Sequence, residues 1–189
     1  MPEAPQYRLE VEPLDLGADV RAIGLELLEP ESREPTAGAD AARIWSRVLP
    51  ALAGAELWAF DFFSHFDRVR EFCDRHAIVY RPAAARALVI SPPEGAQLEA
   101  LLKRFAGETF GARAGGPLEA GDAALEGDLS RRGVDAYHPA FGNYFFCAAC
   151  DFENGFLTLL TNRLSTSEVV RRLAPAVRNL RVDVRMVSA

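Results

Sequence analysis

The chain has 189 residues, of which 49% are hydrophobic and 25% charged, and its formal net charge is −6. A chain of this size can bury its own core, so we expect residues 1–189 to form a single globular domain. It has no apolar run near the ~18 residues of a membrane-spanning helix, and its first residues lack the basic and apolar segments of an export signal. These properties predict a soluble cytoplasmic protein with no membrane partner.

The excess of acidic residues disfavours DNA and RNA as partners, because proteins draw most of their affinity for nucleic acid from basic residues placed along the phosphates. The basic residues are scattered here, and the pairs Arg131-Arg132 and Arg171-Arg172 lie among acids. An acidic surface suits a basic protein partner. Lys103 is the only lysine, and this preference for arginine is typical of a GC-rich bacterial genome.

The first part of the chain predicts a hairpin followed by a helix and a strand. Residues 7–12 alternate apolar and charged side chains, as a half-buried strand does. Residues 20–30 fit either a strand or a helix, and we favour the strand because Gly17 and Asp19 could form the turn of a hairpin. A polar loop with two prolines follows.

Asp40 is the expected N-cap of the first helix, which should end at Gly54. Its apolar residues Ile44 and Val48 recur at helical spacing on one face. Residues 55–63 are apolar almost throughout, which predicts a strand that is covered on both faces.

Three later helices are marked by capping boxes, in which a serine and an acid three residues further on satisfy free backbone amides. The boxes begin at Ser64, Ser91 and Ser165, and they predict helices that end near His76, Gly107 and Asn179. Between the first two helices, residues 77–81 and 86–91 predict short strands joined by Pro82 and three alanines.

Residues 107–142 hold eight of the 14 glycines. This composition disfavours regular structure beyond a short helix, so we expect a glycine-rich insertion there, with a mobile first part. After it, residues 143–162 predict two strands joined by a turn at Gly155, and residues 180–186 alternate as a final strand.

Together these elements predict an α+β (or mixed α/β) fold with a single, mostly antiparallel sheet and about four helices, in a split-βαβ plan. Both ends of the chain have the order ββαβ. Residues 47–54 and 172–179 also place a proline at the same point before a strand. Duplication of one ββαβ unit is one interpretation of this likeness, and chance in a sequence rich in Ala, Leu and Arg is the other.

Cys147 and Cys150 have the C-x-x-C spacing of redox and zinc sites, but the aromatic residues around them predict a strand. Side chains three positions apart point to opposite faces of a regular strand, so the two thiols cannot converge unless the strand is bulged. A structural zinc site needs four ligands, and His138 is the only histidine nearby. We therefore favour packing as the role of this pair, with a metal or redox site as the alternative.

Asp61, His65 and Asp67 follow one another at the end of a predicted buried strand, where many α/β folds place their active sites. A carboxylate near His65 could orient it as a general base. Helix capping already explains Asp67, whereas a buried Asp61 needs a partner. The candidate catalytic residues are therefore Asp61 and His65, with His138 as a further possibility.

Tyr137, His138, Phe141 and Tyr144 lie in an uncharged stretch at the end of the glycine-rich segment. Aromatic side chains in such a place either line a binding surface or anchor the segment to the core. We treat these four residues as the candidate binding residues.

The sequence contains no phosphate-binding loop, dinucleotide fingerprint, nucleophile elbow or metalloprotease motif, and it predicts no cofactor. It favours a non-catalytic module that binds another protein, of the inhibitor, immunity or adaptor type. The alternative is a small-molecule enzyme with an Asp/His site beneath the loop at 107–142.

Overall fold

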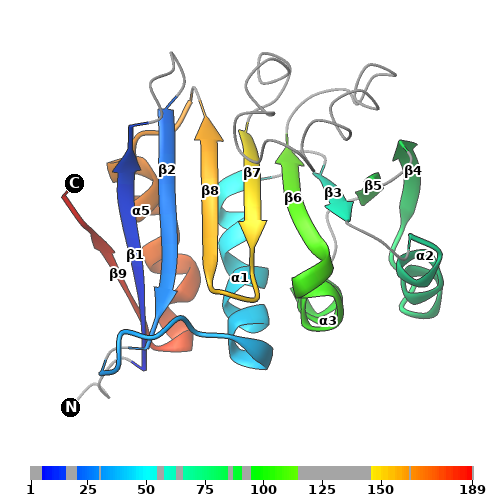
Figure 1. Ribbon diagram of the computed structural model, residues 1–189, viewed down its shortest axis with the longest axis horizontal. Helices are drawn as coiled ribbons and strands as arrows, with labels where there is room; N and C mark the ends of the chain where they lie inside the picture. The colour runs from blue at the N-terminus through cyan, green and yellow to red at the C-terminus, as the bar shows by residue number, and fades with distance from the viewer. Residues whose placement is uncertain are drawn as a thin grey trace.

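The structure is a computed structural model that describes residues 6–15, 21–29, 31–54, 58–62, 66–84, 87–90, 95–114, 146–161 and 163–188. In these residues nine strands form one sheet, and four α-helices pack against it (Figure 1). The strands are β1 (Tyr7–Leu14), β2 (Arg21–Leu28), β3 (Trp58–Phe62), β4 (Tyr80–Ala84), β5 (Ala87–Ile90), β6 (Thr109–Ala114), β7 (Phe146–Asp151), β8 (Phe156–Thr161) and β9 (Val182–Met186). The helices are α1 (Gly38–Ala53), α2 (Phe66–Arg75), α3 (Gly95–Phe105) and α5 (Thr166–Val177). None of these helices has the length and apolarity needed to cross a membrane.

The strand order in the sheet is β4-β5-β3-β6-β7-β8-β2-β1-β9. Neighbouring strands are antiparallel, except that β1 and β9 are parallel. Helices α1 and α5 each connect two parallel strands that are not neighbours, β2 to β3 and β8 to β9. The arrangement confirms the predicted α+β class, with a mostly antiparallel sheet, four described helices and a split βαβ plan.

The described helices all pack on one face of the sheet. The hydrophobic core contains strand residues of one parity only, such as Leu25 in β2, Leu157 in β8 and Phe60 in β3, together with Trp45 of α1 and Leu173 of α5. Figure 1 shows α1 and α5 side by side behind the strands. We call the opposite face of the sheet, which no described helix covers, the helix-free face.

Local sequence signals predict several elements correctly. The two hairpins β1–β2 and β7–β8 and the final strand β9 are confirmed. Helix α5 begins as expected, with the Ser165 hydroxyl accepting a hydrogen bond of 3.2 Å from the backbone N–H of Glu168. The capping serines Ser64 and Ser91 lie outside the described residues, although α2 and α3 end where the sequence predicts.

Helix α1 begins at Gly38, so the prediction that Asp40 is its N-cap is wrong. The N-cap is Ala37, which has no side chain able to cap. The preceding loop fixes this start, because the N–H of Thr36 donates to the C=O of Leu27 at 2.9 Å and ties the chain to β2. Asp40 instead lies in the first turn, where its negative charge interacts favourably with the helix dipole.

Strand β4 begins three residues later than predicted and includes Pro82, which we expected in the connection to β5. Ala77 has a φ of 53°, and the N–H of Ile78 donates to the C=O of Cys73 at 2.9 Å. These residues therefore fold back over the end of α2 instead of extending. The sheet tolerates Pro82 because β4 is its edge strand, where a missing donor costs little.

Strand β6 lies inside the segment that the sequence predicts to be an irregular insertion. It pairs with β3 on one side and β7 on the other, so it is a central strand. Its residues Gly111, Ala112 and Ala114 are buried. Small residues have low strand propensity, and here the two partner strands and the helices above them decide the conformation. The part of the predicted insertion outside the described residues is 115–142.

The likeness between the two ββαβ ends stays an interpretation. Pro50 and Pro175 do lie inside α1 and α5. However, three strands separate β2 from β3, whereas two strands separate β8 from β9. The two crossovers therefore differ by one strand.

Candidate functional site

Only one of the candidate catalytic and aromatic residues belongs to the described part of the chain. His65, Tyr137, His138, Phe141 and Tyr144 lie outside it. Asp61 is described through its backbone, which pairs with Ala87 of β5 and Gly111 of β6. The ladder between β3 and β6 is irregular between Asp61 and Phe62, where its register shifts. A catalytic role of Asp61 with either histidine stays a prediction.

Strand β7 carries Cys147 and Cys150 in a continuous ladder with β8. That ladder has no bulge of the kind that could bring the two thiols together. Cys150 is half-buried and packs against the hydrophobic core. Cys73 is buried in α2, and its burial, with a smaller contribution from the charge of Asp74, raises the pKa of its thiol to about 11. Packing as the role of the Cys147 and Cys150 pair stays a prediction, since the structure describes the side chain of Cys150 alone.

Within the described ranges, no group of three or more His, Cys, Asp or Glu side chains is placed to hold a metal ion. His76 follows the end of α2, and its ring stacks on that of Phe72 with the centroids 4.1 Å apart. The backbone C=O of His76 accepts a hydrogen bond of 3.2 Å from Gln97 of α3. His76 therefore joins α2 to α3.

The helix-free face is apolar and buried near one end of the strands and acidic towards the other. Near the end of the sheet where β6 ends and β7 begins, Ala22, Leu160 and Val89 are buried. Towards the other end the face carries carboxylates and the half-buried ring of Phe156. We call this second region the acidic patch; its members are Glu10, Glu12, Glu26, Asp151 and Phe156.

Two strands bring three carboxylates of the acidic patch together. Glu10 of β1 and Glu26 of β2 are direct partners in the antiparallel ladder, and Glu12 is the partner of Gly24. A Cβ atom on Gly24 would lie 3.1 Å from Cγ and 3.2 Å from Oε1 of Glu12, so the Glu12 side chain lies over this glycine. Like charges directly opposite each other destabilise a sheet. The opposition of Glu10 and Glu26 is therefore unfavourable for the sheet, and the arginines beside Glu10 offset part of it.

Arginines neutralise one of these three carboxylates. Arg8 and Arg33 approach Oε1 of Glu10 at 3.5 Å and 3.4 Å. Among the side chains that the structure describes, Glu12 and Glu26 have no cationic partner. The next strand extends the patch, because Phe156 of β8 is the ladder partner of Glu26.

The acidic patch could not be located from the sequence, because residues 20–30 fit either a strand or a helix and neither strand on its own indicates its register with the other. The alternation of acids in residues 7–12 was a visible signal. Only the register of the hairpin places Glu10 opposite Glu26 and Gly24 beneath Glu12. Pairing the two predicted strands at each possible register would have revealed the like-charge pair.

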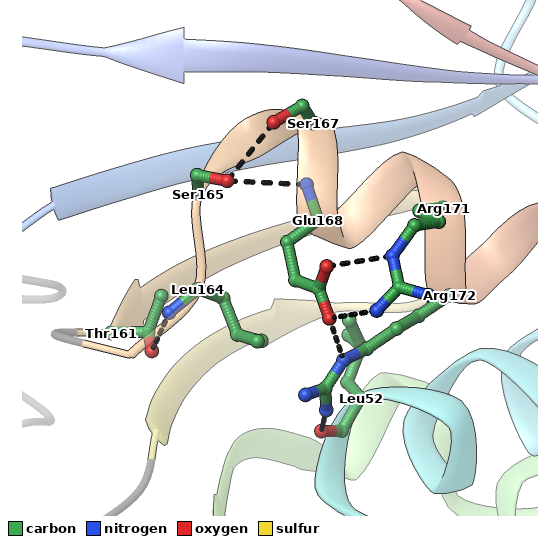
Figure 2. Close-up of polar contacts among 8 residues, drawn as sticks. All are labelled: Leu52, Thr161, Leu164, Ser165, Ser167, Glu168, Arg171 and Arg172. Atoms are coloured by element: carbon green, nitrogen blue, oxygen red, sulfur yellow. Dashed lines mark hydrogen bonds and ion pairs between the residues drawn. The ribbon is translucent and has the colours of Figure 1, made fainter.

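A polar network joins α5 to the end of α1 (Figure 2). Glu168 accepts hydrogen bonds of 2.8 Å from Arg171 and 2.9 Å from Arg172. These bonds lower the pKa of Glu168 to about 2. Arg172 also donates to the C=O of Leu52 at 3.3 Å. Carbonyls in the last turn of a helix have no partner within the helix, so Arg172 satisfies one of them for α1.

The same region connects to the centre of the sheet. Thr161 at the end of β8 is the ladder partner of Phe146, the first residue of β7. Its hydroxyl accepts a hydrogen bond of 3.3 Å from the N–H of Leu164, which begins the turn into α5 (Figure 2). Ala114, the last residue of β6, is also paired with Phe146. The network therefore braces the end of the sheet at which the chain leaves β6 and returns in β7.

The described residues thus offer two polar features. The first is the network around Glu168, whose groups hydrogen-bond to one another. The second is the acidic patch, in which Glu12 and Glu26 have no cationic partner among the described residues. No protein-family model, no curated protein and no solved structure matches this chain.

Proposed function

We propose that this protein is a non-catalytic module that binds a basic segment of another protein through the helix-free face of its sheet. The observation that supports this proposal is the direct opposition of Glu10 and Glu26, next to a Glu12 side chain that has no cationic partner among the described residues. Opposed like charges weaken a fold, and proteins keep such conflicts mainly at functional positions. A cationic ligand would remove the conflict.

The shape of the acidic patch suits a peptide segment. Its carboxylates lie on neighbouring strands, and directly opposed positions of a sheet are about 5 Å apart. Phe156 offers an apolar ring beside them, on which the stem and charge of an arginine or lysine can rest. The net charge of −6 also attracts a basic partner at a distance and raises the rate of encounter.

The candidate aromatic residues would provide further contacts with the protein partner. The segment that contains Tyr137, His138, Phe141 and Tyr144 joins β6 to β7, two neighbouring strands in the middle of the sheet. We propose that these side chains extend the binding surface beyond the acidic patch. Alanine at Phe141 or Tyr144 is then expected to weaken partner binding without changing the secondary structure.

The double charge reversal Glu12→Lys/Glu26→Lys tests the proposed function. The matched control is Glu71→Lys/Glu99→Lys on α2 and α3, which changes the net charge by the same amount on the other side of the sheet. Each protein is used as bait in an extract of the cells that naturally contain it. We expect the wild type and the control to capture the same partner and the Glu12/Glu26 variant to lose it. Equal capture by both variants would refute the proposal.

One observation supports an enzyme as the second candidate. The register of the ladder shifts beside Asp61, and bulges are common next to active sites because they redirect side chains. If Asp61 acts on a small molecule, a panel of metabolites should contain one that raises the melting temperature of the wild type but not of Asp61→Asn. Asp67→Asn serves as the control, because a capping role predicts that it keeps the shift.

A further inference from the structure

We propose that strand β9 pairs with β9 of a second copy of this chain, antiparallel and centred on Val184. The two edges of the sheet that the described strands form are β4 and β9. The β4 edge is protected by Pro82 and by a register shift after it, two common defences against pairing with another chain. Strand β9 has neither proline nor irregularity in its five residues. One edge is therefore blocked, and the other is regular.

The backbone of β9 presents its free groups outwards at alternate residues. The N–H of Val187 donates to the C=O of Val11 at 2.9 Å, and the C=O of Arg181 accepts from the N–H of Tyr7 at 3.3 Å. Alternate residues of a strand direct their backbone groups to opposite sides. Val184 therefore directs its N–H and C=O away from β1, and no described strand pairs with that side.

The charges of β9 select one register for such a pairing. With Val184 at the centre, Asp183 lies opposite Arg185 of the second copy, and Arg185 lies opposite Asp183 of the second copy. A centre at Asp183 or at Arg185 would instead place like charges together. Only the register centred on Val184 therefore gives favourable cross-strand pairs at both charged positions.

The neighbouring strand continues the same pattern. In the parallel pairing of β1 and β9, Arg8 is the partner of Asp183 and Glu10 is the partner of Arg185. Four side chains on neighbouring strands then lie in one row across the proposed interface: Glu10, Arg185, Asp183 of the second copy and Arg8 of the second copy. The sign of the charge alternates at each step, so every charge has opposite charges beside it.

The apolar residues on the other side of β9 fit the same register. Met186 is 60% exposed, which is unusual for a large hydrophobic side chain. Pairing about Val184 places it opposite Val182 of the second copy, which is buried near α5. The pairing would therefore cover an apolar side chain that the single chain leaves in water.

A single strand edge buries less surface than a standard protein–protein interface, so we expect a reversible dimer with micromolar affinity. The acidic patch does not take part in the proposed pairing except at Glu10. Dimer formation and partner binding can consequently succeed or fail independently.

Charge exchange between two variants is the direct test. The Asp183→Arg variant carries arginine at positions 183 and 185, and the Arg185→Asp variant carries aspartate at both. Because position 183 of one copy lies opposite position 185 of the other, a homodimer of either variant would place like charges opposite each other. We expect sedimentation equilibrium to show a concentration-dependent dimer for the wild type and monomers for each variant. An equimolar mixture of the two variants should form a heterodimer, because each arginine of one variant then lies opposite an aspartate of the other across the interface. A mixture that stays monomeric would overturn the proposal, as would a wild type that stays monomeric up to near-millimolar concentration.

Val184→Pro tests the backbone pairing separately. It removes an outward N–H and leaves the hydrogen bonds between β9 and β1 in place, so the variant should keep the circular dichroism spectrum of the wild type and remain a monomer. Val184→Ala, which keeps the N–H, should still dimerise. Equal dimerisation of the proline and alanine variants would overturn the proposed pairing.

Discussion

At the residue scale, the turn between β7 and β8 depends on Gly155. Its φ is +71°, and a Cβ atom there would lie 2.8 Å from the backbone oxygen of Leu27. Gly38 has a similar φ of +73° but nothing within 4 Å of such an atom. We predict that Gly155→Ala lowers the free energy of unfolding by about 3 kcal/mol, and Gly38→Ala by about 1 kcal/mol, because only the first adds a clash to the backbone strain. Urea titration measures both, and equal losses would contradict the close approach to Leu27.

A second residue-scale prediction concerns the opposed carboxylates. Glu26→Gln removes one charge of the pair with Glu10 and keeps the shape of the side chain. We expect the free energy of unfolding to rise by about 0.5 kcal/mol in low salt and the gain to shrink in high salt. Glu99→Gln on α3 is the control and should change little. A loss of stability in Glu26→Gln would show that this carboxylate has a stabilising partner.

At the element scale, Arg171 and Arg172 form a matched pair in α5. Both bond to Glu168, but only Arg172 also reaches the C=O of Leu52 in α1. Arg172→Ala should therefore lower the midpoint of urea unfolding clearly more than Arg171→Ala, since it leaves a helix-end carbonyl without its donor. Equal midpoints for the two variants would mean that the bond to α1 contributes nothing measurable.

The elements that the sequence predicts well are those set by local signals. The hairpin turn at Gly155 and the cap at Ser165 are short patterns, and the structure confirms both. Strand β6 escaped prediction because its small residues become a strand only between two partners. The start of β4 was misplaced because backbone hydrogen bonds to the end of α2 hold residues 76–78. Tertiary contacts decided both, and no local pattern records them.

The acidic patch also depends on contacts between distant parts of the chain, so the sequence alone did not predict it. Its residues come from β1, β2, β7 and β8, which are distant in the chain and adjacent in the sheet. Sequence periodicity predicts that Glu10 faces outwards, but the pairing that makes Glu26 its neighbour is a property of the assembled sheet. The sequence therefore predicted the acidic character of the protein without locating it.

At the scale of the whole molecule, the sheet separates two kinds of surface. The described helices cover one face and build the core, while the other face carries the acidic patch. This division gives the helix side a structural role, and it is the helix-free face that we propose for recognition. The proposed pairing at β9 would extend this face across two copies of the chain.

Photocrosslinking in living cells tests recognition by the helix-free face most directly. A benzophenone amino acid replaces Phe156 in the acidic patch or, as the control, the exposed Ala96 at the start of α3. We predict that irradiation joins a partner protein to position 156 but not to position 96, and that Glu26→Lys in the same chain abolishes the product. A product from position 96 alone, or none from position 156, would contradict recognition by this face.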